Sequence, residues 1–145
     1  MSRKDKARGL FKEGANCAQA VFGVFADDLG LTEEAALRVT AVFGGGICSS
    51  GATCGAVTGA FMALGLRHGV ATAERPGQDE KTAVARAREL ARRFMKRNMS
   101  TQCNVLLGHD ISTAGGMSRI QAEGLFGTRC IKFVEDAVEI AEELM

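Results

Sequence analysis

An apolar stretch near the middle of the chain, residues 53–68, constrains the fold more than any other feature. A helix formed here is hydrophobic on almost every side, through Ala56, Val57, Ala60, Phe61, Met62, Ala63, Leu64 and Leu66. Such a helix normally forms the buried centre of a bundle. Gly51, Gly55 and Gly59 recur at four-residue spacing, which lets neighbouring helices pack closely. The apolar run is shorter than the roughly 20 residues that span a membrane, so we expect no membrane insertion.

The composition favours a single all-α domain over residues 1–145. A chain of 145 residues can bury an ordinary core without disulfide bonds. It contains one proline and no tryptophan or tyrosine, and it is rich in the helix formers Ala, Leu, Glu and Arg. No segment has a convincing strand pattern, so we predict a bundle of five to six helices around the central apolar helix. The net charge of +1 gives no global field for binding nucleic acid.

The first predicted helix begins at Ser2 and ends at Gly30. Ser2 and Asp5 have the spacing of a capping box at its start. Cys17 belongs to an apolar stripe at helical spacing. We therefore expect Cys17 in the middle of this helix, on the face toward the core.

Further elements follow, separated by glycines and the single proline. The fourth predicted helix has a basic outer face, without the interleaved aromatic residues that bind nucleic acid. The last helix has an acidic face, and acids in its last turn oppose the helix dipole, so this end either frays or lies against the basic helix. The predicted elements are a helix from Thr32 to about Phe43, the central helix from Thr53 to His68, a linker at Arg75–Gln78, a helix capped by Asp79, a short helix at Cys103–Leu107, a turn near Ser118–Gly124 and a last helix from Thr128.

The five cysteines carry the chemistry of this chain. It opens on charged residues without the apolar region of a signal peptide, so we expect a cytoplasmic protein. Thiols in that compartment are normally reduced, which points to metal binding, redox catalysis or simple burial instead of structural disulfides.

Three of the cysteines are expected in the first turns of helices. Cys54 follows a run of glycines and precedes the central helix, while Cys103 and Cys130 each follow a threonine two residues earlier. Threonine is a common N-cap residue, and the positive end of a helix favours a thiolate. We therefore expect a lowered pKa and raised reactivity at Cys54.

The chain resembles the family of redox-active proteins named for its C…GCAxxG…C…C pattern. The resemblance covers about residues 10 to 135, and the core motif here has the order Cys-Gly-Ala-x-x-Gly. It implies that the four characteristic cysteines are Cys17, Cys54, Cys103 and Cys130, with Cys48 as an extra. The matching pieces are Asn16–Val21, Gly44–Gly46, Cys54–Gly59, Leu64–Leu66, Cys103, Leu106–Gly108, Asp110 and Cys130.

Three hypotheses follow for these four cysteines. In the first, the protein is a thiol–disulfide oxidoreductase that needs no cofactor: Cys54 attacks, Cys17 or Cys103 resolves, and the redox partner is unknown. In the second, Cys17, Cys54, Cys103 and Cys130 bind a metal or an iron–sulfur cluster. In the third, the chain is a non-catalytic helical module with structural thiols.

Two further points stay open at this level. His109 and Asp110, which follow the third characteristic cysteine, either orient a thiol or cap a turn. The glycine-lined apolar helix makes a homodimer a further expectation, since one of its faces could pack against a second copy.

Overall fold

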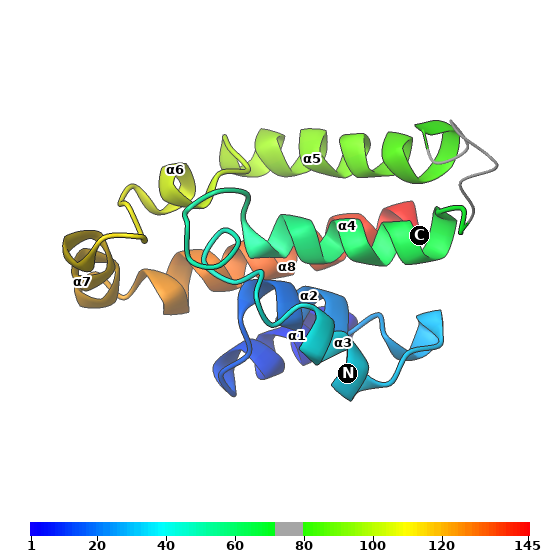
Figure 1. Ribbon diagram of the computed structural model, residues 1–145, viewed down its shortest axis with the longest axis horizontal. Coiled ribbons are helices and arrows are strands. Elements are labelled where there is room, and N and C mark those ends of the chain that lie inside the picture. Colours follow the sequence, from blue (N-terminus) through cyan, green and yellow to red (C-terminus); the bar gives the residue numbers. More distant parts are fainter. Residues whose placement is uncertain (72–79) are drawn as a thin grey trace.

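The computed structural model describes residues 1–71 and 80–145, and the predicted all-α bundle is confirmed there (Figure 1). The predicted linker and the cap Asp79 lie outside the described residues. No described helix has the length and hydropathy needed to cross a bilayer. The helices are α1 (Arg3–Lys12), α2 (Cys17–Gly23), α3 (Glu33–Val39), α4 (Gly55–His68), α5 (Ala85–Asn98), α6 (Cys103–Leu107), α7 (Ala114–Ala122) and α8 (Ile131–Leu144), with a 3-10 turn at Asp27–Leu29 and π-helical turns at Glu80–Val84 and Phe126–Cys130.

The apolar helix α4 forms the centre of the bundle, as the sequence predicts. It packs against α2, α5 and α8, and Figure 1 shows α4, α5 and α8 running along the long axis of the molecule. Ala56, Ala60 and Leu64 of α4 are completely buried. The short helices α6 and α7 lie at one end of these three, and α1, α2 and α3 lie on one side.

The crossing of α2 and α4 depends on two glycines of α4. A Cβ added to Gly59 would lie 2.8 Å from the carbonyl oxygen of Ala18. At Gly55 the added atom would lie 3.0 Å from the Ala18 amide and 3.1 Å from the Cβ of Cys17. The missing side chains therefore let α2 approach the start of α4 at backbone distance.

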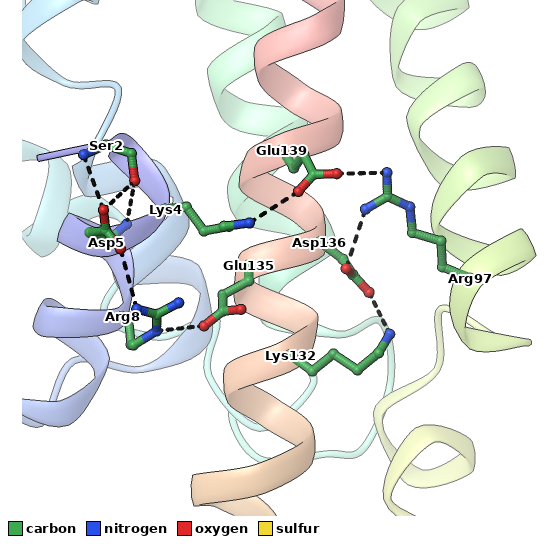
Figure 2. A network of polar contacts seen from close by, with 9 residues as sticks. All are labelled: Ser2, Lys4, Asp5, Arg8, Arg97, Lys132, Glu135, Asp136 and Glu139. Carbon is green, nitrogen blue, oxygen red and sulfur yellow. Dashed lines mark hydrogen bonds and ion pairs between the residues drawn. The ribbon is translucent and has the colours of Figure 1, made fainter.

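The acidic face of the last helix lies against two basic helices (Figure 2). Arg97 of α5 binds Asp136 at 3.3 Å and Glu139 at 3.0 Å. From the opposite side, Lys4 of α1 binds Glu139 and Arg8 binds Glu135. Of the two predicted alternatives for the C-terminal helix, packing against the basic helix is the one observed.

The prediction of one helix from Ser2 to Gly30 is wrong. Gly14 has a φ of +111°, a conformation that no α-helix contains, and the chain breaks there into α1 and α2. Asn16 begins the second helix: its side chain accepts from the amide of Gln19, whose own side chain accepts from the Asn16 amide. This capping box was readable in the sequence. Only the box formed by Ser2 and Asp5 was predicted, and it is confirmed.

Other boundaries also differ from the prediction. The helix expected from Thr32 to Phe43 ends at Val39, with Thr40 as its C-cap, and the chain then enters a run of turns. The turn near Ser118–Gly124 is the C-terminal part of α7. The short helix Cys103–Leu107 is confirmed at both ends.

The same substitution at two glycines of α4 should change stability in opposite directions. Gly59→Ala should lower the free energy of unfolding by about 1–3 kcal/mol, because the new methyl group meets the Ala18 carbonyl. Gly65 lies in the same helix with no atom within 4 Å of an added Cβ, so Gly65→Ala should raise it by roughly 0.5–1 kcal/mol. Urea denaturation of both variants checks this. Equal effects would show that the α2–α4 contact does not depend on Gly59.

Candidate functional site

Cys17 is the first residue of α2, not a residue in the middle of a helix as predicted. The break at Gly14 and the cap formed by Asn16 place it there. Its side chain is half-buried, and its Cβ lies against Gly55 at the start of α4. The crossing of α2 and α4 therefore brings the first cysteine to the start of the central helix.

Cys54 and Cys103 are held by a short backbone pairing. Thr53 and Gln102 form an isolated antiparallel bridge. Its two hydrogen bonds run from the Cys54 amide to the Thr101 carbonyl, at 2.7 Å, and from the Cys103 amide to the Ala52 carbonyl, at 2.6 Å. Since side chains alternate across extended backbone, both cysteines extend from the same face of this pairing. Cys54 is the N-cap of α4 and Cys103 is the first residue of α6.

Cys130 lies within a helix, and its predicted place in a first turn is wrong. The π-helical turn Phe126–Cys130 runs directly into α8, and the φ of Cys130 is −63°. The predicted N-cap Thr128 donates its hydroxyl to the Gly124 carbonyl, inside the helical path. A threonine can cap the start of a helix or donate its hydroxyl to a carbonyl within one, and the spacing to the next cysteine does not distinguish these two roles.

The four characteristic cysteines line one cavity of about 30 Å³. This volume holds about one water molecule and no substrate. Cys54, Cys103 and Cys130 are buried and Cys17 is half-buried. The rest of the wall is apolar side chains and glycine backbone, from Gly45, Gly46, Gly55, Leu106, Leu107, Ile111, Phe126 and Phe133.

A left-handed turn of backbone at residues 45–49 closes one side of this cavity. Each of its residues has a φ between +53° and +72°, including the non-glycine residues Ile47, Cys48 and Ser49. Each of those three costs about 1–2 kcal/mol of backbone strain. A Cβ at Gly46 would lie 2.7 Å from the Cβ of Cys103, so the third glycine of the triplet must lack a side chain. Cys48 is exposed on the turn and does not line the cavity.

Burial opposes ionisation of two of the thiols. It raises the pKa of Cys54 to about 12, although the amides of Ala56 and Val57 at the start of α4 act in the opposite direction. Burial likewise raises the pKa of Cys103 to about 11. The predicted lowering of the pKa of Cys54 is therefore wrong, because the loss of hydration outweighs the helix terminus.

Cys17 and Cys130 interact directly through a hydrogen bond between their side chains. The Cys17 thiol donates to Cys130, which raises the pKa of Cys17 and lowers that of Cys130. A charge on Cys54, Cys130 or Cys103 would raise the pKa of Cys17 further by repulsion. The pair therefore holds one proton firmly and releases the other more easily.

His109 and Asp110, whose roles the sequence leaves open, form hydrogen bonds with polar residues and not with a cysteine. The imidazole of His109 is hydrogen-bonded to Glu123 at 2.9 Å. Asp110 accepts hydrogen bonds from Asn104 and from Ser112, and so caps the turn after α6. Within the part of the chain that the structure describes, no three Cys, His, Asp or Glu side chains are grouped so that they could hold a metal ion.

The fold and site are those of a small helical protein with four cysteines gathered at one buried point. A family model described as "Putative redox-active protein (C_GCAxxG_C_C)" matches residues 15–144, and the chain belongs to this family. Neither the search of curated proteins nor the search of solved structures found a match.

Gly46→Ala should destabilise the protein more than a substitution at a comparable glycine. Gly30 also has a positive φ, of +78°, but open space surrounds it, so Gly30→Ala should cost only about 1–2 kcal/mol of backbone strain. Gly46→Ala adds close contacts with the backbone of Ala52 and with the Cβ of Cys103, together worth about a further 1–3 kcal/mol. Thermal and urea denaturation of the two variants measure the difference. A difference near zero would contradict tight packing of the turn on Cys103.

Stability should fall in alkaline solution because of the buried thiols. Below the ordinary thiol pKa of 9.0, both folded and unfolded chains keep these protons. Above it the unfolded chain releases protons that folded Cys54 and Cys103 retain, so the free energy of unfolding decreases as the pH rises from 9.0 toward about 12. The slope should approach about 1.4 kcal/mol per pH unit for each such thiol. Urea denaturation at a series of pH values measures it. Cys54→Ala, less stable at neutral pH, should show a shallower slope, and an unchanged slope would contradict the raised pKa.

Proposed function

We propose that this protein is a thiol–disulfide redox protein in which Cys17 and Cys130 form the reactive pair. The observation that carries the proposal is that both cysteines line the same small cavity, where their interaction raises the pKa of Cys17 and lowers that of Cys130. A disulfide between them requires that their Cα atoms lie within about 7 Å of each other. Cys54, assigned as the attacking residue in the first hypothesis, is buried and has a pKa of about 12, whereas Cys17 also lines a surface hollow where a partner can reach it.

The hydrogen bond also suggests the order of the chemical steps. Once Cys130 has lost its proton, its thiolate accepts the proton of Cys17 while the Cys17 sulfur attacks a disulfide of the partner. The first sulfur of the partner leaves as a thiolate and takes from the solvent the proton that Cys130 released, and a mixed disulfide joins Cys17 to the second. Cys130 then loses the proton and attacks the Cys17 sulfur, which releases the second partner thiol. The partner disulfide is reduced to two thiols, and the protein is oxidised to one disulfide.

The apolar surroundings favour a disulfide in the cavity over two or more thiolates. Each thiolate placed in the cavity is penalised by burial and by repulsion from the others. A disulfide carries no charge, so oxidation removes two protons without leaving a buried anion. Cys54 and Cys103 remain neutral thiols on the wall at physiological pH, where disulfide exchange with them is slow.

A metal or iron–sulfur centre on Cys17, Cys54, Cys103 and Cys130 is the second proposal, because all four line the same cavity. The described arrangement would have to contract before three sulfur atoms could bind one metal ion. Elemental analysis of protein purified without air separates the two proposals. Stoichiometric metal that is lost from Cys54→Ala and Cys103→Ala would favour the metal centre.

Oxidation with diamide should remove two hydrogens from the protein and join Cys17 to Cys130. Intact mass and peptide mapping of the alkylated protein measure both. Cys17→Ala and Cys130→Ala should each abolish this cross-link, whereas Cys48→Ala, at the exposed cysteine, should leave it unchanged. Circular dichroism confirms that each variant is folded. A cross-link between other cysteines, or no cross-link in the folded protein, would refute the proposed pair.

A further inference from the structure

A second hollow, much larger than the cysteine cavity, adjoins it at the surface. This groove has a volume of about 800 Å³, within the range of sites that hold small molecules or short peptides. The groove and the cavity share Cys17, Gly45, Ile111 and Phe126 as lining residues. The cavity itself has no room for a substrate, so Cys17 lies where an external molecule in the groove would meet the buried pair.

The lining of the groove indicates which molecules fit. None of the described residues that form it carries a charge; they are Phe11, Gly14, Ala15, Asn16, Cys17, Ala41, Val42, Gly44, Gly45, Cys48, Ser49, Ile111, Met117 and Phe126. Apolar side chains and glycine backbone predominate. A ligand carboxylate placed here would lose its hydration without gaining a cationic partner.

We infer that this groove binds an uncharged, apolar cysteine-containing segment of a partner protein and presents its disulfide to Cys17. The inference rests on the proposed exchange at Cys17 and Cys130 and specifies its substrate class. The small anionic disulfide of glutathione is the contrasting substrate, because its carboxylates need basic residues that the groove lacks. Cys17 attacks the partner disulfide as described above, with the two partner thiols as products.

Two surface valines provide a matched pair of variants. Val42 lines the groove and is 60% exposed, while Val39 lies on α3 outside the groove and is 56% exposed. Val42→Lys places a cation in the groove, and Val39→Lys adds the same charge outside it. Both residues already face solvent, so neither change should disturb the core.

The first measurement is binding without chemistry. The probe is a terminally blocked apolar peptide in which serine replaces cysteine, titrated into the reduced protein by calorimetry. Val42→Lys should weaken binding about tenfold because the ammonium group loses hydration under the peptide, and Val39→Lys should not change it. No binding to the unmodified protein, or equal affinities for both variants, would overturn the inference. Neither result would contradict the proposed Cys17–Cys130 pair.

The second measurement is exchange, followed as thiol release. The disulfide-linked dimer of the corresponding cysteine peptide should oxidise the reduced protein about tenfold faster than glutathione disulfide does. Val42→Lys should reduce the ratio of the two rates, because the added cation should speed the reaction with glutathione disulfide. Val39→Lys should leave the ratio unchanged. A preference for glutathione disulfide in the unmodified protein would overturn the inference. Diamide tests the pair independently, since failure of its cross-link refutes the proposed function even where the peptide binds.

Discussion

The close approach of α2 to α4 is the contact on which the site depends. Gly55 and Gly59 leave the backbone of α4 open to Ala18, and Cys17 therefore lies beside the start of the central helix. A helix pair separated by ordinary side chains has its axes 8–10 Å apart. A side chain at Gly55 would meet the Cβ of Cys17 at 3.1 Å and the Ala18 amide at 3.0 Å. The glycines thus have a structural role that directly determines which cysteines meet.

The site combines two opposing influences on its thiols. Helix termini at Cys17, Cys54 and Cys103 favour negative charge, but the apolar wall removes the water that would stabilise it. Burial is the larger effect, as the raised pKa values of Cys54 and Cys103 show. Only the thiol–thiol hydrogen bond reverses the balance, and it does so at Cys130 alone. The ionisation of these thiols therefore depends more on burial and on the interaction of Cys17 with Cys130 than on the nearby helix termini.

The sequence predicted the class of fold and the central helix because hydrophobic periodicity is a local signal. It also indicated the four cysteines, which the structure brings to one cavity. It did not predict that Cys17 begins a helix, because a continuous apolar stripe runs through the Asn16–Gln19 capping box and resembles one long helix. The pKa of Cys54 could not be predicted either, since its burial depends on α2 and α6, which are distant from it in the sequence.

The strained turn at residues 45–49 lies between the two hollows, with one side facing the cavity and the other facing the groove. On its inner side Gly46 packs on Cys103, and on its outer side Cys48 and Ser49 line the groove. Three non-glycine residues with positive φ persist only where surrounding contacts fix the backbone. Here those contacts include hydrogen bonds from the Gly51 and Ala52 amides to the carbonyls of Gly45 and Gly46. The buried thiols are thus shielded from solvent by backbone, and Cys17 is the one cysteine that lines both hollows. Under the proposed function, a partner held in the groove therefore reaches the cysteines of the cavity through Cys17.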